Sequence, residues 1–168
     1  IEYLIMPPKS KQTNNNDMIN FYLHKDIQKH LAKSHNPNFE DHQISLPAWI
    51  GIIGNSGSRK SLTLLDFIAK ANDTFSHIYI CAKTPDEPLY KFLLEKVKKD
   101  ITFFSRLSEL PLSKDLERQG ENTLLVIDDM CNERNQEVVN EYFIFGRKLG
   151  ITSVYISQSY FKIPKTTR

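Results

Sequence analysis

Residues 54–61 carry the clearest chemical pattern in the sequence. An apolar run ends at Gly54, a turn rich in glycine and serine follows, and the turn ends with Lys60 and Ser61. In the pattern G-x-x-x-x-G-K-[ST], small residues let backbone N–H groups surround phosphate oxygens, the lysine neutralises their charge and the hydroxyl binds Mg²⁺. The stretch therefore predicts a loop that binds nucleotide phosphates. The members of this loop, called the phosphate loop below, are Gly54, Asn55, Ser56, Gly57, Ser58, Arg59, Lys60 and Ser61.

Arg59 stands where the pattern has its second glycine. A side chain at this position costs strain if φ is positive, and it takes up space if the backbone must approach the phosphates closely. Three interpretations therefore stay open. The arginine weakens or abolishes nucleotide binding, it is accommodated as an extra phosphate contact, or the segment is an ordinary connection between a strand and a helix.

Two acidic residues and a glutamine follow later apolar runs. Asp128 and Asp129 end the run 123–127, and Gln158 comes just after the run 151–156. Hydrolysis of ATP needs a phosphate cradle, Mg²⁺ and an oriented water. Ser61 would bind the Mg²⁺, Asp128 would hold its hydration shell, Asp129 would orient or deprotonate the water, and Gln158 would contact the γ-phosphate or that water. The acid pair and Gln158 also have a plainer explanation as polar residues at the ends of strands.

Arg147 and Arg168 are the candidate arginine fingers. Such an arginine stabilises negative charge during phosphoryl transfer and often comes from a neighbouring subunit, so this role would require a ring of copies. Taken alone, each is more simply a surface arginine.

Strand-like and helical patterns alternate along the chain, which predicts an α/β fold with a mainly parallel sheet and helices on both faces. Ligands of such sheets bind at the carboxyl ends of the strands, so one rim should collect Lys60, the acid pair and Gln158. The predicted strands are 48–53, 75–81, 101–104, 123–127 and 151–156, and the predicted helices are 17–33, 60–68, 89–97, 105–119 and 133–149. A further edge strand is predicted at residues 1–6, and a loop at 34–47.

The 168 residues, 40% of them hydrophobic and 25% charged, suit one globular domain. We divide the chain into an extension with one helix and a linker, 1–47, and a core, 48–168. The net charge of +2 is too small to indicate a nucleic-acid partner by itself. No apolar run has the length of a membrane span, so we expect a soluble, intracellular protein. Cys81 and Cys131 lack metal-ligand spacing and are expected to be buried thiols.

These motifs together resemble the packaging ATPases of large DNA viruses and virophages, the poxvirus-type branch of the FtsK-HerA superfamily. The phosphate loop and the run from Leu124 to Asp129 are shared by many P-loop proteins. The most specific part of the resemblance is the block 145–151 with its continuation through 155–165. The resemblance covers 50–168, about seven-tenths of the chain.

The resemblance implies a three-layer RecA-like P-loop NTPase fold with an extra strand between the phosphate-loop strand and the acidic strand. It implies ATP hydrolysis with Mg²⁺, a homo-oligomeric ring, and translocation of double-stranded DNA into a capsid at the host-cell site of virus assembly, with capsid or portal-vertex proteins as partners. Lys60 and Ser61 match the Walker A contacts and Asp128 the Walker B acid. Asp129 matches the adjacent catalytic acid, and Gln158 the sensor glutamine. Arg147 and Arg168 match arginines of related motors.

The sequence departs from the family pattern in two places, and these departures motivate other interpretations of its function and completeness. Arg59 replaces a glycine, which motivates a second hypothesis: a degenerate paralogue that does not hydrolyse ATP and serves as a structural or interaction subunit. The chain also stops where related proteins continue into further strands, so we expect a fragment that lacks C-terminal elements. A small-molecule P-loop kinase is a weaker third option, because no arginine-rich lid is visible between the helices.

Overall fold

The computed structural model describes residues 20–28, 35–97, 100–116 and 121–167. The chain divides into two compact units, Ile1–Lys33 and Ser34–Arg168. In the first unit the structure describes a 3₁₀ turn, Phe21–Leu23, and one helical turn, α1 (Lys25–Gln28). The rest of the helix predicted at 17–33 and the edge strand predicted at 1–6 lie outside the described residues. The boundary between extension and core placed at residue 47 stays a prediction.

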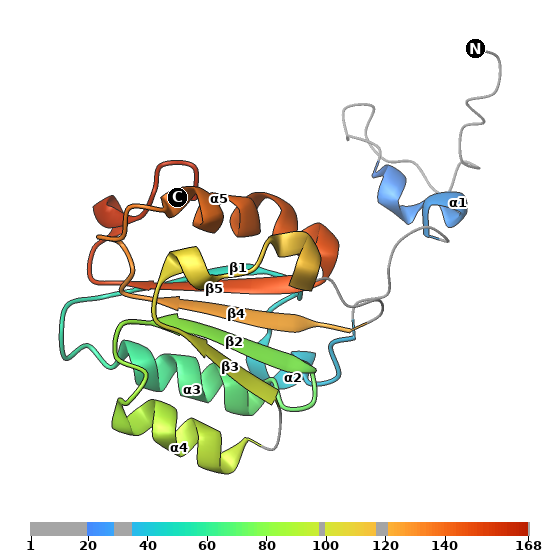
Figure 1. Ribbon diagram of the computed structural model, residues 1–168. Coiled ribbons are helices and arrows are strands. Elements are labelled where there is room, and N and C mark those ends of the chain that lie inside the picture. The colour runs from blue at the N-terminus through green and yellow to red at the C-terminus, as the bar shows by residue number, and fades with distance from the viewer. Residues whose placement is uncertain (1–19, 29–34, 98–99, 117–120, 168) are drawn as a thin grey trace. The chain divides into compact units, whose positions relative to one another are not determined.

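The second unit is built on a sheet of five parallel strands in the order β1-β5-β4-β2-β3 (Figure 1). The strands are β1 (Trp49–Ile53), β2 (His77–Ala82), β3 (Asp100–Phe104), β4 (Thr123–Asp128) and β5 (Ile151–Ser157). This confirms the predicted parallel sheet. It also places β5 between β1, which leads into the phosphate loop, and β4, which ends in Asp128, as the resemblance implied.

Helices cover both faces of the sheet (Figure 1). On one face lie α3 (Lys60–Lys70), α4 (Pro88–Lys96) and the short α2 (Phe39–His42), which falls within the predicted loop 34–47. On the other face lies α5 (Gln136–Phe145), which continues as a 3₁₀ turn, Gly146–Leu149. Gly150 then ends the helical segment at φ 74°, a left-handed conformation that glycine adopts without strain.

The helix predicted at 105–119 is wrong where the structure describes it. Residues 105–116 contain two 3₁₀ turns, Leu107–Glu109 and Ser113–Leu116. Between them Leu110 has extended backbone angles, φ −64° and ψ 132°. Leu110 precedes Pro111, and the ring of a proline disfavours helical angles in the residue before it.

Two apolar clusters lie on opposite sides of the sheet. The cluster under α3 and α4 contains Leu124 and Val126 of β4, and the cluster under α5 contains Leu125 and Ile127. All four side chains are fully buried. This explains why β4 is apolar without alternation, since helices cover both of its faces. A strand held in this way fixes the position of the acidic residues that end it.

The helices in the described part of the chain are short. The longest, α3, has eleven residues, and none of the described helices has the length and hydropathy required to cross a membrane.

Candidate functional site

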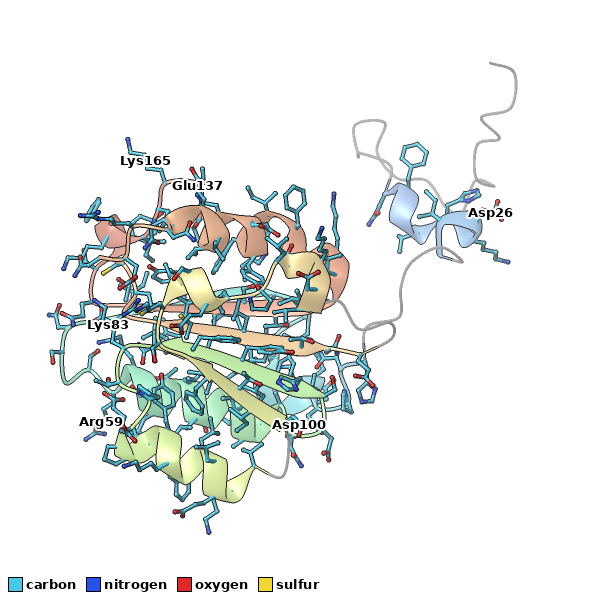
Figure 2. The ribbon with its side chains drawn as sticks, viewed as in Figure 1. Asp26, Arg59, Lys83, Asp100, Glu137 and Lys165 are labelled. Atoms are coloured by element: carbon cyan, nitrogen blue, oxygen red, sulfur yellow. The ribbon has the colours of Figure 1, made fainter. Side chains whose placement is uncertain are left out.

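One cleft at the carboxyl ends of the strands contains most of the predicted site residues. Its volume is about 460 Å³. Figure 2 shows Arg59 and Lys83 at this end of the sheet and Asp100, the first residue of β3, at the opposite end. The cleft is lined by Ser56, Gly57, Arg59, Lys60, Ser61, Leu62, Ala82, Lys83, Thr84, Glu87, Leu89, Asp128, Asp129 and Gln158. The fold therefore brings the phosphate loop, the acid pair and the glutamine together.

The backbone of the phosphate loop is held to the sheet and to itself. The N–H of Gly54 donates to the carbonyl of Ser157 at 3.2 Å, so the loop begins tied to β5. The N–H of Ser58 donates to the carbonyl of Asn55 at 3.1 Å and closes a turn, in which Gly57 has φ 80°. These contacts hold the loop at the mouth of the cleft.

Gly54 has no room for a side chain. A Cβ at this position would lie 3.1 Å from Cβ of Ser58 and closer still to its hydroxyl oxygen. We expect Gly54→Ala to displace the loop and to lower the free energy of unfolding by about 1–3 kcal/mol, the usual cost of overpacking. Urea unfolding measures this.

The matched control is Gly51→Ala on β1, where a Cβ would meet only Cδ1 of Ile53 at 3.8 Å. Equal stabilities of the two variants would contradict the tight turn described here.

Arg59 precedes the first residue of α3 and has φ 62° and ψ 30°. The backbone therefore keeps the left-handed conformation that a glycine would adopt there, and the predicted condition for strain is met. For a residue with a side chain this conformation costs roughly 1–2 kcal/mol. The side chain itself is exposed and lines the cleft. The arginine thus strains the backbone of the loop, while its side chain stays exposed to solvent at the cleft.

Lys60 begins α3 and turns back over the phosphate loop. Its Nζ donates to the carbonyls of Gly54 at 2.8 Å and Asn55 at 3.0 Å. The N-terminus of α3 also faces the cleft, because Lys60 and Ser61 both line it. The ammonium group, the free N–H groups of the first turn and the helix dipole together favour an anion at this end of the cleft.

Asp128 ends β4 opposite the phosphate loop and is half-buried. The hydroxyl of Tyr90 on α4 donates to its Oδ2 at 2.5 Å. Burial raises the pKa of Asp128, and the nearby charges of Glu87 and Asp129 raise it further, whereas the Tyr90 hydrogen bond and Lys60 act to lower it. The carboxylate is therefore poorly solvated and lies near two other acids, and a bound divalent cation would offset both effects.

Asp129 follows Asp128 with φ 50°, a left-handed conformation, so the extended backbone of β4 ends before it. Its Oδ2 accepts a hydrogen bond from the Gln158 amide at 3.0 Å, and its Oδ1 lies 3.8 Å from Sγ of Cys131. Cys131 is half-buried rather than buried, while Cys81 is fully buried as predicted, and both are free thiols. The structure thus links the second acid and the glutamine directly.

Arg147, one of the two predicted arginine fingers, is absent from the lining of this cleft. Arg147 lies in the 3₁₀ turn before β5, with its guanidinium carbon 5.6 Å from the ring centre of Trp49. Trp49 is the first residue of β1, so both residues are at the amino ends of the strands, opposite the phosphate loop. Arg168 lies outside the described residues.

The sequence reasoning missed several residues that line the cleft from β2 and α4. Lys83 and Thr84 follow the end of β2, and Glu87 comes just before α4. Ala82, the last residue of β2, pairs with Asp128 of β4. The predicted strand 75–81 contained the signal needed to find them, because in a parallel sheet the residues after every strand reach the same rim.

The side chains that line the cleft suit both of the expected ligands, ATP and Mg²⁺. Mg²⁺ typically takes one or two carboxylates together with substrate phosphates and waters, and the Ser61 hydroxyl and Asp128 lie in one cleft with the phosphate loop. The described residues hold no cluster of three or more His, Cys, Asp or Glu side chains suited to a metal by themselves. Mg²⁺ in this cleft would share its coordination between protein oxygens, waters and the phosphates of a bound nucleotide.

The sequence matches the family described as Poxvirus A32 protein over residues 38–168. This chain belongs to the poxvirus A32 family. The match covers the phosphate loop, the acid pair, Gln158 and both arginines. Among curated protein sequences none matches the chain.

Two solved structures resemble this member of the A32 family. The pCW3 conjugation coupling protein TcpA, in a monomer form with ATPγS, has a TM-score of 0.51 and 14% identity. The cytoplasmic domain of the type VII secretion ATPase EccC from Thermomonospora curvata has a TM-score of 0.51 and 13% identity. The similarity covers 72% of this chain but only 46% of TcpA and 17% of the EccC chain. These similarities confirm the RecA-like P-loop ATPase fold.

Proposed function

We propose that this A32-family chain binds Mg-ATP in the cleft and hydrolyses it. The observation that carries the proposal is the meeting of Lys60 and Ser61 with Asp128, Asp129 and Gln158 in one cleft. Phosphoryl transfer requires positioning and electrostatic stabilisation more than covalent chemistry, and these groups supply both.

Each residue then has a separate task. Bound Mg²⁺ would neutralise charge on the phosphates. Lys60 would exchange its two carbonyl acceptors for phosphate oxygens, and the Ser61 hydroxyl and Asp128 would face the cation. Asp129 would orient a water and accept its proton, held in place by the amide of Gln158. Arg59 would lie at the edge of the phosphates.

The larger proposal is a motor subunit that moves double-stranded DNA into a viral capsid, by membership of the A32 family and by the resemblance in sequence. Such a subunit would work in a homo-oligomeric ring, with Arg147 or Arg168 of one copy reaching the nucleotide of the next, and with capsid or portal-vertex proteins at the assembly site. The position of Arg147 at the far end of the sheet fits a role toward a neighbour better than a role in its own cleft.

The test is ATP hydrolysis by the full-length protein, measured with and without double-stranded DNA at several salt concentrations. We expect DNA to raise the rate, and the effect to weaken as salt increases, because contacts to the DNA backbone release counterions. A folded, full-length protein with no hydrolysis in either condition would contradict the proposal.

Arg59 supports the second candidate, a degenerate copy that does not hydrolyse ATP. Under the first candidate, Arg59→Gly should raise the free energy of unfolding by about 1 kcal/mol, because it removes the strain of a left-handed residue. It should change the affinity for Mg-ATP by less than about tenfold, or 1.4 kcal/mol, because the loop backbone already has the glycine-like conformation. Isothermal titration calorimetry and urea unfolding measure the two effects.

The matched control is Gln43→Gly, the same change at φ 56° outside the cleft. It should give a similar gain in stability with no effect on binding. A gain in affinity far above tenfold for Arg59→Gly would favour the degenerate copy, and a loss would show that the arginine contacts phosphate.

A further inference from the structure

Tyr90 is a buried residue that makes a hydrogen bond to an acid of the cleft lining, Asp128. It lies on α4, its side chain is 1% exposed, and its ring packs edge-to-face on Phe103 with the ring centres 5.7 Å apart. Its hydroxyl donates to Oδ2 of Asp128 at 2.5 Å. The hydrogen bond thus joins a ring fixed by packing to the acid that ends β4.

We propose that Tyr90 is a positioning residue that holds Asp128 in the orientation needed for the cation of a bound nucleotide. The inference rests on the proposed function, because Asp128 needs an orientation only if it serves a cation. It adds a residue to the site that lies on α4, which none of the sequence motifs includes.

The geometry explains how the hydrogen bond would act. An ionised carboxylate has two oxygens and several lone pairs, so a hydrogen bond to Oδ2 leaves Oδ1 for the cation or its water. Asp128 is only half-buried, and without the bond its side chain could turn toward the open cleft. Tyr90 cannot follow such a turn, because its ring is buried in the apolar cluster on this side of the sheet and packs against Phe103.

The N-terminal end of α4 belongs to the same cleft. Glu87 immediately before the helix and Leu89 in its first turn line it, and Pro88 begins the helix with a backbone angle that suits the first position. A shift of α4 would therefore move the Tyr90 hydroxyl together with the wall of the cleft. The position of α4 is thus coupled to the orientation of Asp128 through the Tyr90 hydrogen bond.

The experiment compares the affinity for a non-hydrolysable ATP analogue with Mg²⁺ and with EDTA, in the full-length protein and its variants. For Tyr90→Phe we expect the enhancement by Mg²⁺ to fall roughly tenfold, as losses of residues that orient a metal ligand do. The affinity in EDTA should stay within about twofold, because the phosphate loop is untouched.

Tyr142→Phe is the matched control. Tyr142 is equally buried, and its hydroxyl donates to the carbonyl of Pro111 on the other side of the sheet. Loss of the Tyr142 hydroxyl should lower the stability of the fold about as much as loss of the Tyr90 hydroxyl does. It should leave the enhancement of binding by Mg²⁺ unchanged. Tyr90→Phe keeps the ring and should fold, which a thermal unfolding curve checks. As a second measurement, adding Tyr90→Phe to Asp128→Asn should change the Mg²⁺ enhancement no further.

The outcomes separate the two proposals. An Mg²⁺ enhancement that Tyr90→Phe leaves intact, or that both tyrosine variants reduce equally, would overturn the positioning role and leave the proposed ATPase standing. A folded parent protein that binds no analogue with or without Mg²⁺ would overturn the proposed function itself, and the positioning role with it.

Discussion

Replacing Lys60 with alanine is expected to weaken binding of Mg-ATP about 10- to 100-fold, since hydrogen bonds to charged groups contribute about 1.5–3 kcal/mol. Hydrolysis should fall further, by about 100- to 1,000-fold, because under the proposed function the ammonium would face the phosphates where negative charge increases during transfer. Calorimetry gives the first effect and a steady-state assay of phosphate release the second.

The structure also supplies the controls for Lys60→Ala. Nζ of Lys60 holds the carbonyls of Gly54 and Asn55, so the variant can loosen the loop without any nucleotide. Lys60→Arg keeps the charge and should retain more binding than alanine. Lys70→Ala removes an exposed lysine from the other end of the same helix, where it pairs with Asp66 at 2.8 Å, and should leave binding unchanged. If Lys60→Ala hydrolyses ATP at the parent rate, the proposed role of the phosphate loop in hydrolysis is wrong.

Most of the sheet could be predicted from the sequence because its strands are apolar and its turns are marked. The β4 run is buried on both faces, which makes it a continuous apolar stretch of four residues, 124–127, followed by two acids. The helices α3 and α4 begin at Lys60 and at Pro88, each within a residue or two of its predicted start. These elements follow from local patterns, so a single sequence is enough to find them.

Residues 105–116 show where local patterns fail. Their leucines suggested a helix, but the structure buries Leu107 and Leu116 from two separate 3₁₀ turns, and Leu110 from the extended residue between them. Burial of leucines at helical spacing is compatible with both structures. Pro111 was the better signal, since it restricts the residue before it.

The candidate site was predictable where it followed from strand ends and unpredictable where it came from packing. Gln158 reaches Asp129 because β5 lies next to β4, and that neighbour relation follows from the sheet order rather than from the spacing of the two residues. Tyr90 lies within the predicted helix 89–97, and its ring belongs to the apolar core. The hydroxyl is the part that reaches Asp128, and no sequence pattern separates such a tyrosine from Tyr142.

The order of strands also explains why three separate motifs meet in one cleft. β5 lies between β1 and β4, so Gln158 emerges between the phosphate loop on one side and the acid pair on the other. The Gly54 N–H bond to the Ser157 carbonyl ties the loop to the strand that carries the glutamine. The N–H of Asp129 donates to the carbonyl of Ile156 on that strand at 3.0 Å, so the second acid is tied to it as well. A displacement of β5 would thus change both walls of the cleft.

Asp129→Asn is the variant that separates chemistry from binding. Asparagine has the same shape and tolerates the left-handed φ of 50°, so the backbone should not change. Its amide cannot accept a proton from water, and loss of a general base typically costs about 100- to 10,000-fold in rate. We therefore expect hydrolysis to fall at least about 100-fold while the affinity for Mg-ATP changes less than about threefold.

The control for Asp129→Asn is the same change at Asp73, which has φ 60° and is absent from the lining of the cleft. Asp73→Asn should leave hydrolysis and binding as in the parent. Single-turnover measurements with prebound ATP distinguish a slow chemical step from slow product release. If Asp129→Asn hydrolyses ATP at the parent rate, another carboxylate must serve as the base, and Glu87 is the remaining acid that lines the cleft besides Asp128. Glu87→Gln would then be expected to show the loss predicted here for Asp129→Asn, because only one of the two acids can accept the proton of the attacking water in a given turnover.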